Sequence, residues 1–433
     1  MNSLTFLTDR FPPTEARIWK QHLQYELAGR EYARTLVYNS HEEIPILPFY
    51  DSHSERLSSA VKAKASIGAT LYCTDIELTT ANINRWHSRG VYFFNVTLHD
   101  EKLDWRALFE RMPPGVGGRV YWAFPTEKKH NELSEYLRQH PSWSIAFDPI
   151  AQLMRTGKWY DEIATDLRMP DPNLLTVDTT LVQQAGASMV QQLAYAMSHA
   201  VHYLNCVTPD SQHVKISFRV SVGGHFLWEM AKLRALRSLA EKITKCYEIP
   251  VEVEIHGYLS QRHLSLQSGS YNQNYSDLAY QSLYFGGSDY IFIHNSIIYE
   301  KNRWENEIPT YEKIQKIVAA ENPQWWDGSH AVQALSYEIA KKALKLFQEI
   351  ETSGGIIKHL ENNILQRKVK EKAMQEQALF DASWQNVRFS ADDFVAKNEW
   401  ERYPFVKRNR AKTPIEPLVA SRLWEKIERK IYF

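Results

Sequence analysis

Short apolar runs and helix-period stretches alternate along most of this chain. The clearest unit lies between Asn173 and Cys206, where an apolar run ends in the polar triplet 178–180, a glycine-containing turn follows, and about five turns of helix come next. The following unit, from Val214 onward, repeats the plan with VKISFRV, a turn at 223–224, and HFLWEMAKLRALRSLAEKI. A strand, a short loop and a helix in succession predict the βα units of a parallel sheet.

Eight apolar runs of this kind are spaced along the chain. They are 69–76 (ATLYCTDI), 91–96 (VYFFNV), 119–124 (RVYWAF), 142–147 (SWSIAF), 174–179 (LLTVDT), 214–220 (VKISFRV), 251–259 (VEVEIHGYL) and 290–295 (YIFIHN). Eight βα units are what a (β/α)8 TIM barrel requires, and we predict this α/β fold. A doubly wound sheet is the alternative, because spacing alone does not exclude it.

The N-terminal part lies outside this alternation. It is polar and contains a predicted helix over 18–27, with Gly29 as a stop signal. The two prolines of IPILPFY (44–50) indicate an extended connector and not a central strand.

The C-terminal part is predicted to be helical. After a loop, a helix is expected over 330–351, ending at Gly354-Gly355, and a charged helix over 361–380. The closing EPLVASRLWEKIERKIYF reads as another amphipathic helix. We therefore divide the chain into an N-terminal arm (1–43), the barrel (44–360) and a C-terminal helical extension (361–433).

Composition narrows the function classes. Lys+Arg and Asp+Glu both number 51, so the net charge of zero argues against a nucleic-acid surface. No window approaches about 18 uncharged apolar residues, so no membrane span is predicted, and the N-terminus lacks a secretory signal pattern. Cys73, Cys206 and Cys246 form no C-x-x-C pair, which indicates reduced thiols and a cytoplasmic location.

Five segments, in this order, resemble the barrel chains of the methylmalonyl-CoA mutase family, the cobalamin-dependent acyl-CoA mutases. They are WKQHLQYELAGREYARTLVYNSHEEIPILPFY, VQQAGASMVQQLAYAMSHAVHYL, ISFRVSVGGHFLWEMAKLRALRSLAEKI, YNQNYSDLAYQSLYFGGSDYIFIHN and HAVQALSYEIAKKALKLFQEIETSGG. They cover nearly the whole chain, and the resemblance implies a barrel that holds acyl-CoA. The closing PLVASRLWEKIER resembles the segment that leads into the family's cobalamin domain.

The resemblance further implies a separate flavodoxin-like domain, in which a D-x-H-x-x-G histidine coordinates cobalt. The nearest string here is Asp51-Ser52-His53, but Arg56 stands where glycine is required and no βα domain follows in register. We expect a solvated loop at this string, no cobalamin-binding flavodoxin-like domain, and no cofactor or metal bound by this chain.

The resemblance also implies a catalytic Tyr-His pair just before a Q-x-A-G-A turn, which is 183–187 in this chain. The histidine would polarise the thioester carbonyl, and the tyrosine would pack against the radical centre. Thr180 and Leu181 stand at these positions, and Leu181 can neither donate a hydrogen bond nor carry a proton. Tyr50 lies near the family's other catalytic tyrosine but belongs to the PFY connector. We expect no catalytic residue in this chain.

This pattern resembles the small, non-catalytic subunit of heterodimeric bacterial methylmalonyl-CoA mutases. The implied function is to stabilise a catalytic large subunit that binds adenosylcobalamin and interconverts methylmalonyl-CoA and succinyl-CoA in propionate metabolism. One alternative is a catalytic barrel chain of an acyl-CoA mutase that uses a separate cobalamin-binding subunit. A second is a barrel enzyme of different chemistry that uses His256 or His294.

Several other polar residues invite a functional interpretation. His199 and His202, at i and i+3 on a helix, have metal-binding spacing, but no third ligand follows, and apolar helices often carry a stray histidine. His256, His263 and His294 are placed at or just beyond strand ends, where they are either remnants of a site or solvent-facing groups. Lys232, Arg234 and Arg237 could bind phosphate, but helical spacing places them on a solvated helix face. Gly223-Gly224 lacks the remainder of a phosphate loop.

Aromatic residues are unevenly distributed. The strands carry many large rings, as expected for a filled barrel: Tyr92, Phe93, Phe94, Tyr121, Trp122, Trp143 and Phe147. The segments outside the barrel carry others, which would suit a large permanent interface or would pack on the chain's own barrel: Trp19, Trp384, Trp400 and Trp424.

Overall fold

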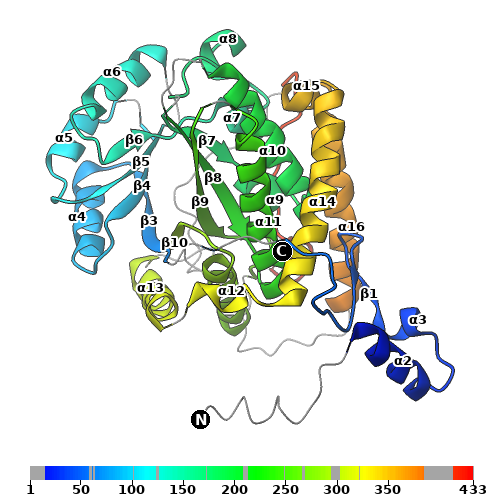
Figure 1. Ribbon diagram of the computed structural model, residues 1–433. Helices are drawn as coiled ribbons and strands as arrows, with labels where there is room; N and C mark the ends of the chain where they lie inside the picture. Colours follow the sequence, from blue (N-terminus) through cyan, green and yellow to red (C-terminus); the bar gives the residue numbers. More distant parts are fainter. Residues whose placement is uncertain are drawn as a thin grey trace.

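The fold is seen in a computed structural model (Figure 1). It describes residues 15–57, 61, 64–100, 102–122, 126–171, 173–207, 213–247, 249–265, 269–293, 303–320, 322–384 and 413–432. Two predicted anchor residues, Trp400 and the side chain of Trp384, and the candidate His294 lie outside this description. Among the described helices, none is long and apolar enough to cross a membrane.

Eight parallel strands form one curled sheet. They are β3 (Ser66–Cys73), β4 (Phe93–Leu98), β5 (Gly117–Trp122), β6 (Trp143–Ile145), β7 (Leu175–Asp178), β8 (Val214–Val222), β9 (Val251–Leu259) and β10 (Tyr290–Ile293). Each corresponds to one of the eight predicted runs. The strand order is β6-β5-β4-β3-β10-β9-β8-β7, so the last strand pairs with the first, as in a barrel.

Helices follow the strands and cover the outside of the sheet. Those of the barrel are α4 (Ile76–His87), α5 (Trp105–Glu110), α6 (Glu127–Leu137), α7 (Pro149–Thr156), α8 (Ile163–Asp166), α9 (Thr180–Gln184), α10 (Met189–Cys206), α11 (Phe226–Thr244), α12 (Gly269–Phe285) and α13 (Arg303–Ala320). The sequence prediction missed α13, which contains Pro309 inside the helix, a residue that normally interrupts one.

Two contacts across the lumen distinguish this barrel from the doubly wound alternative. Arg119 on β5 donates a hydrogen bond to Glu254 on β9 at 3.0 Å. Four strand spacings separate these strands along the sheet, which is about 19 Å in a flat sheet. Asn95 on β4 likewise donates to the hydroxyl of Tyr258 on β9. The sheet is therefore rolled on itself, and the predicted (β/α)8 barrel is confirmed.

The lumen near the amino ends of the strands is filled by charged side chains, here called the floor cluster: Arg119, Lys215, Glu254 and His256. Lys215 donates to the Glu254 carboxylate at 2.8 Å, and the His256 ring lies 3.3 Å from it. Burial alone raises the pKa of Glu254, but the His256 and Arg119 contacts outweigh burial and hold that pKa well below its usual range. Glu254 is therefore ionised at neutral pH.

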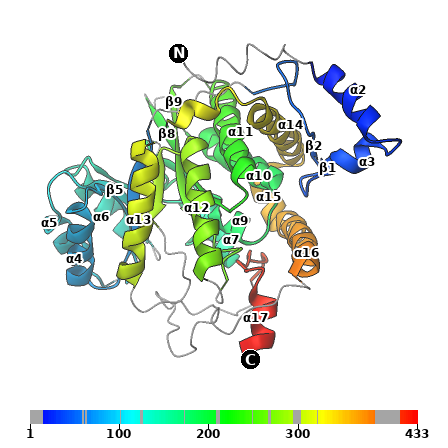
Figure 2. The same ribbon diagram turned by 90° about the horizontal axis from the view of Figure 1, so that it is seen from below.

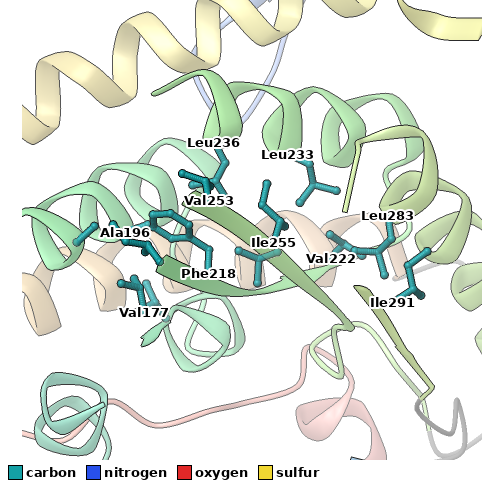
Figure 3. Packing of buried hydrophobic residues seen from close by; sticks show 14 of the residues in the cluster. Val177, Ala196, Phe218, Val222, Leu233, Leu236, Val253, Ile255, Leu283 and Ile291 are labelled. Atoms are coloured by element: carbon teal, nitrogen blue, oxygen red, sulfur yellow. The ribbon is translucent and has the colours of Figure 1, made fainter. Parts of the chain in front are cut away.

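The hydrophobic core lies between the strands and the outer helices (Figure 3). Val177, Phe218 and Ile255 point outward from adjacent strands toward helices such as α10 and α11. Side chains alternate along a strand, so their neighbours point into the lumen. The aromatic strand residues divide in the same way: Phe93 and Tyr121 share contacts with lumen side chains, while Phe94 and Trp122 belong to the outer core.

Helices beyond the barrel add a third layer on one side. These are η1 (Pro323–Trp326), α14 (His330–Thr352), α15 (Gly355–Glu361), α16 (Ile364–Trp384) and α17 (Glu425–Tyr432). The long helix α14 packs on α10 and α11 (Figure 1). It ends where predicted, with Gly354 in the left-handed region at φ 110°.

The C-terminal segment 413–424 is not helical, although the sequence predicted a helix from residue 416 onward. Its backbone bonds to barrel loops: Leu418 N donates to Met154 O at 2.7 Å, and Ser421 N donates to Gln184 O at 3.1 Å. Two prolines, at 414 and 417, also disfavour helix in this segment. Figure 2 shows this red segment beside α9 and α16. Only α17 within the predicted region is helical.

The N-terminal arm consists of α2 (Ala16–Glu26), α3 (Tyr32–Leu36) and a two-stranded sheet of β1 (Tyr38–Asn39) with β2 (Pro45–Ile46). Its root is anchored, because the Glu42 carboxylate accepts from the backbone N–H groups of Met189 and Val190 at 2.6 and 3.1 Å. These are first-turn donors of α10, which have no partner within the helix. Beyond this root, α2 and α3 project away from the barrel (Figure 1).

We predict that Glu254→Gln destabilises the protein by about 3–5 kcal/mol, because it leaves Arg119 buried without its carboxylate. Chemical denaturation of both proteins measures this difference. The exposed pair Arg138–Glu135 provides the control, since Glu135→Gln should cost less than about 1 kcal/mol. Equal effects of the two substitutions would show that the floor cluster does not stabilise the barrel.

Candidate functional site at the C-terminal mouth of the barrel

The carboxyl ends of β7, β8 and β9 converge at one end of the lumen, the end where barrel enzymes carry their functional residues. Asp178 is the last residue of β7, and its carboxylate accepts from Arg219 on β8 at 2.6 Å. Arg155 on α7 lies 3.8 Å from the same carboxylate oxygen. Two guanidinium groups therefore approach one buried carboxylate at this mouth.

Two tyrosines hold Arg219 in place. Its guanidinium lies 4.3 Å from the ring centroid of Tyr121 and 4.8 Å from that of Tyr258. Its Nε also donates to the Tyr258 hydroxyl at 3.2 Å. We refer to Asp178, Arg219, Tyr121, Tyr258 and Asn95 as the mouth layer. Cation–π contacts and hydrogen bonds fix the orientation of Arg219 from several sides.

The protonation states of the mouth layer are fixed near neutral pH. Burial tends to raise the pKa of Asp178, but Arg219 and Arg155 outweigh burial and lower it. Burial raises the pKa of Tyr258 well above its usual value. Asp178 is therefore a carboxylate and Tyr258 a neutral phenol, so neither has the pKa near 7 that general acid–base catalysis favours.

Thr180 and Leu181 lie on α9, directly after β7, as the sequence placed them. The Thr180 backbone N–H and hydroxyl both donate to the Asp178 carboxylate, at 2.9 and 2.5 Å. Leu181 is half-buried and packs against the hydrophobic core. Neither side chain supplies an acid, a base or a nucleophile to the mouth.

The turn at 183–187 is tightly covered. Gly186 adopts φ +98°, and a Cβ there would lie 2.5 Å from Ala373 of α16 and 2.6 Å from the Arg262 guanidinium. Only glycine fits both the left-handed backbone and this close approach. The C-terminal extension therefore packs directly on the turn that follows the mouth.

Asp148 bridges the one seam of the barrel, between β6 and β7, which are not paired with each other. Its carboxylate accepts from the backbone N–H of Asp178 at 2.7 Å and from the Tyr203 hydroxyl at 2.7 Å. The His199 ring nitrogen lies 3.0 Å from the same group. His199 thus has a structural partner, and no group of three or more metal-binding side chains occurs in the described part of the chain.

His263 follows β9 and joins the barrel to the C-terminal extension. Its ring lies 3.2 Å from the Tyr275 hydroxyl and 3.4 Å from the Glu376 carboxylate of α16. Its carbonyl oxygen accepts from the Trp424 indole at 2.8 Å. Burial, with help from His225 and Arg262, lowers the pKa of His263 to about 3. This histidine is neutral, and it supports the docking of the extension.

One interpretation of His256 was a solvent-facing group at a strand end, and this interpretation is wrong. It lies within β9, is fully buried in the lumen, and contacts Glu254 of the floor cluster. Burial lowers its pKa. The alternation of β9 places its side chain inward, a position that residue type alone did not reveal.

The prediction that α11 turns a charged face to solvent is also wrong. Lys232, Arg234 and Arg237 are all buried, and their charged ends bond to groups of the barrel and of the segments 285–289 and 327. Lys232 pairs with Glu229 at 2.5 Å, Arg234 with Asp327 at 2.8 Å, and Arg237 with Asp289 at 2.6 Å. These cations are structural, and none is available to a phosphate.

Comparison with known proteins agrees with the fold. The family model for methylmalonyl-CoA mutase matches residues 132–272 and 315–416, more than half of the chain. The chain belongs to the methylmalonyl-CoA mutase family.

Similar relatives include a methylmalonyl-CoA mutase of Cereibacter sphaeroides, 26% identical over 233 residues, which are 50% of this chain and 33% of that protein. The methylmalonyl-CoA mutase large subunit of Streptomyces virginiae is 25% identical over 239 residues, 52% and 32% of the two chains. The 2-hydroxyisobutanoyl-CoA mutase large subunit of Aquincola tertiaricarbonis is 26% identical over 282 residues, 62% and 49%. The matches thus span a third to a half of these relatives.

The described residues do not fit the cobalt-ligating loop that this mutase family implies. Asp51 uses its carboxylate within its own turn, where it accepts from the His53 backbone N–H at 3.0 Å. His53 is exposed on this turn. Apart from the small β1–β2 pair of the arm, the strands of the described part all belong to the barrel. We therefore assign no cofactor contact to His53.

Sequence analysis did not identify most residues of the mouth layer, although one pattern in the strands could have identified some of them. In VKISFRVSV of β8 and VEVEIHGYL of β9, apolar residues alternate with charged or polar ones. An alternating strand in a barrel whose outer face is apolar must point its charges into the lumen. That reasoning identifies Arg219 and Glu254, but not their partners.

We predict that His263 makes the protein less stable as pH falls from about 6.5 to about 5. Its pKa of about 3 when folded lies below the ordinary value, so the unfolded chain takes up the proton first. The free energy of unfolding, measured by denaturation, should fall less steeply with falling pH in His263→Gln than in the unsubstituted protein. The exposed His22 provides the control, because His22→Gln should leave the slope unchanged. Identical slopes for all three proteins would refute this assignment.

Proposed function

We propose that this chain is a non-catalytic barrel subunit of an adenosylcobalamin-dependent methylmalonyl-CoA mutase and stabilises a catalytic large subunit. In this proposal the partner binds adenosylcobalamin and performs the interconversion of methylmalonyl-CoA and succinyl-CoA. Membership of the mutase family supports the proposal. So does the chemistry of the mouth, where Thr180 is hydrogen-bonded to Asp178 and Leu181 is aliphatic.

The filled lumen is the observation that carries the proposal. A catalytic barrel of this type would hold the pantetheine arm of acyl-CoA along its axis, which requires free space there. Here the Arg119–Glu254 pair crosses the axis, and the Asn95–Tyr258 contact crosses it nearer the mouth. Displacing a buried ion pair would leave charges without partners, at a cost of several kcal/mol. Both the floor cluster and the mouth layer therefore disfavour the binding of an extended acyl-CoA thioester in the lumen.

The N-terminal arm supports a role in assembly. Ile18 and Tyr25 on α2 and Tyr38 on β1 are 55%, 85% and 58% exposed, although the arm root at Glu42 is firmly anchored. Large apolar side chains on a projecting arm suit an interface with another chain. Trp424, in contrast, is buried against Phe380 and so serves this chain's own packing.

The alternative is a catalytic barrel chain that uses a separate cobalamin subunit. The likeness to a large subunit of 2-hydroxyisobutanoyl-CoA mutase favours it, since that match covers 62% of this chain. Thr180 and Leu181 oppose it, because neither side chain carries an imidazole that could donate to a thioester carbonyl. Turnover measurements separate the two proposals.

We expect the purified chain to convert no methylmalonyl-CoA to succinyl-CoA when adenosylcobalamin is added. The physical reason is the absence of an imidazole donor at Leu181 and the occupied axis. Chromatographic separation of the two thioesters measures the conversion, with a known mutase as the positive control. Turnover above background by this chain, alone or with a separate cobalamin subunit, would contradict the proposal and favour the alternative.

Co-expression with the large subunit should yield a one-to-one complex in size-exclusion chromatography. We predict that deletion of residues 1–40, or the double substitution Ile18→Ser and Tyr25→Ser, weakens this complex at least about tenfold. The matched control is Leu78→Ser on α4, which removes a side chain about as exposed as Ile18 on the other side of the barrel (Figure 1).

Two results would contradict this assembly. A chain that stays monomeric beside the large subunit at micromolar concentration would refute the subunit proposal. Equal affinities of the α2 double variant and the Leu78 variant would refute the role of the arm.

A further inference from the structure

The arm helix α2 has two apolar sides. One side packs within the chain, where the Trp19 ring stacks on Phe49 with the ring centroids 4.9 Å apart. The other side is exposed and carries Ile18 and Tyr25, which lie about two turns, or roughly 10 Å, apart on one face of the helix. Large exposed apolar side chains on a projecting helix indicate a surface that another chain covers.

A matching exposed face lies on α16. Met374, Ala378 and Ala382 are spaced at i, i+4 and i+8, so they share one exposed side of the helix over roughly 12 Å. Met374 is 66% exposed, and Leu379 at the edge of this face is 48% exposed. The exposed faces of α2 and α16 are thus similar in length. Because both are exposed, α2 does not pack on the α16 face of its own chain.

The charges along the two helices favour an antiparallel pairing. Helix α2 has two cations in its first half, and its only carboxylate, Glu26, is its last residue. In α16, residues 367–372 include four cations and one carboxylate, whereas residues 373–384 include two carboxylates and no cation. Antiparallel packing therefore brings charges of opposite sign together at both ends. Arg262 and Lys426 already pair with the two carboxylates, so the apolar contact contributes most of the affinity.

The two faces lie on the same side of the molecule, with the β1–β2 hairpin between α2 and α16 (Figure 2). Lys372 of α16 pairs with Glu43 of the arm root at 3.2 Å. Lys342 of α14 donates to the carbonyl oxygens of Glu42 and Glu43 at 3.1 and 2.8 Å. These bonds hold the hairpin in place, which limits the freedom that the arm would lose on binding.

We propose that two copies of this chain pair by exchange of their arms, with α2 of each copy packed antiparallel on the α16 face of the other. A two-fold axis near the β1–β2 hairpin relates the two contacts, so both exposed faces of each copy are covered at once. The pairing does not rest on the proposed function. A large subunit that binds the arm would compete with it.

Sedimentation equilibrium of the purified chain between about 1 and 100 μM tests the pairing. We expect the 50.5 kDa monomer to form a dimer with a dissociation constant on the order of 10 μM, because two short helix contacts make a small interface. A monomer throughout this range would overturn the proposal. So would a larger or open-ended assembly, because a two-fold exchange is closed.

Substitutions identify the two faces. The double substitutions Ile18→Ser with Tyr25→Ser, and Met374→Ser with Leu379→Ser, should each weaken the dimer at least about tenfold. The control is Leu278→Ser on α12, a leucine that is 40% exposed, and it should leave the dimer unchanged. All these side chains are exposed, so the fold should tolerate their replacement. A dimer as stable in the α16 variant as in the control would refute the role of α16.

Mixing the α2 variant with the α16 variant tests the exchange itself. A mixed dimer retains one intact contact, between the unsubstituted α2 of one copy and the unsubstituted α16 of the other, whereas a dimer of either variant alone retains none. The mixture should therefore dimerise more strongly than either variant. A mixture no more dimeric than its components would contradict the exchange. The large subunit is absent from these measurements, so this proposal and the subunit proposal fail separately.

Discussion

The contact between Arg119 and Glu254 across the lumen is the constraint on which the barrel interior depends. It joins strands that would lie about 19 Å apart in a flat sheet, so it exists only because the sheet is rolled on itself. In turn it fixes what the interior can hold. A buried ion pair with Lys215 and His256 on the same carboxylate cannot be displaced cheaply, because each displaced charge would remain buried without a partner.

The Arg119–Glu254 pair lies between two ends of the barrel lumen that differ in their side chains. Below it, near the amino ends of the strands, the side chains stabilise the barrel. Above it, Arg219 and the buried Asp178 lie at the mouth, where an extended ligand entering the lumen would meet Tyr258 and Asn95. The C-terminal extension reinforces this division, since Arg262 binds both Glu376 of α16 and the backbone of Ser421. The chain thus has the barrel fold of the mutase family, with ion pairs and hydrogen bonds across its lumen.

Much of the fold could be predicted because it follows from local patterns. All eight strands lie where apolar runs were found, and α14 ends at Gly354 because glycine alone adopts its left-handed backbone comfortably. Helix α13 was missed because Pro309 normally interrupts a helix, and the segment 413–424 was misjudged because its backbone bonds to distant loops. The buried cations of α11 could not be predicted, since their partners, such as Asp327 and Asp289, come from segments distant in sequence. The pair Arg119–Glu254 emerged only from the rolling of the sheet, which brings together strands far apart in it. The pair Arg219–Asp178 depends on the register of β7 with β8.

The central claim is that the interior of this barrel is filled and does not hold an extended acyl-CoA. Its most direct test is calorimetric titration of the purified chain with propionyl-CoA. The account predicts no saturable binding at ligand concentrations up to about 1 mM, which corresponds to a binding free energy weaker than about 4 kcal/mol. One-to-one binding with a micromolar dissociation constant would contradict it, because such affinity requires the thioester to occupy the lumen now crossed by Arg119 and Glu254.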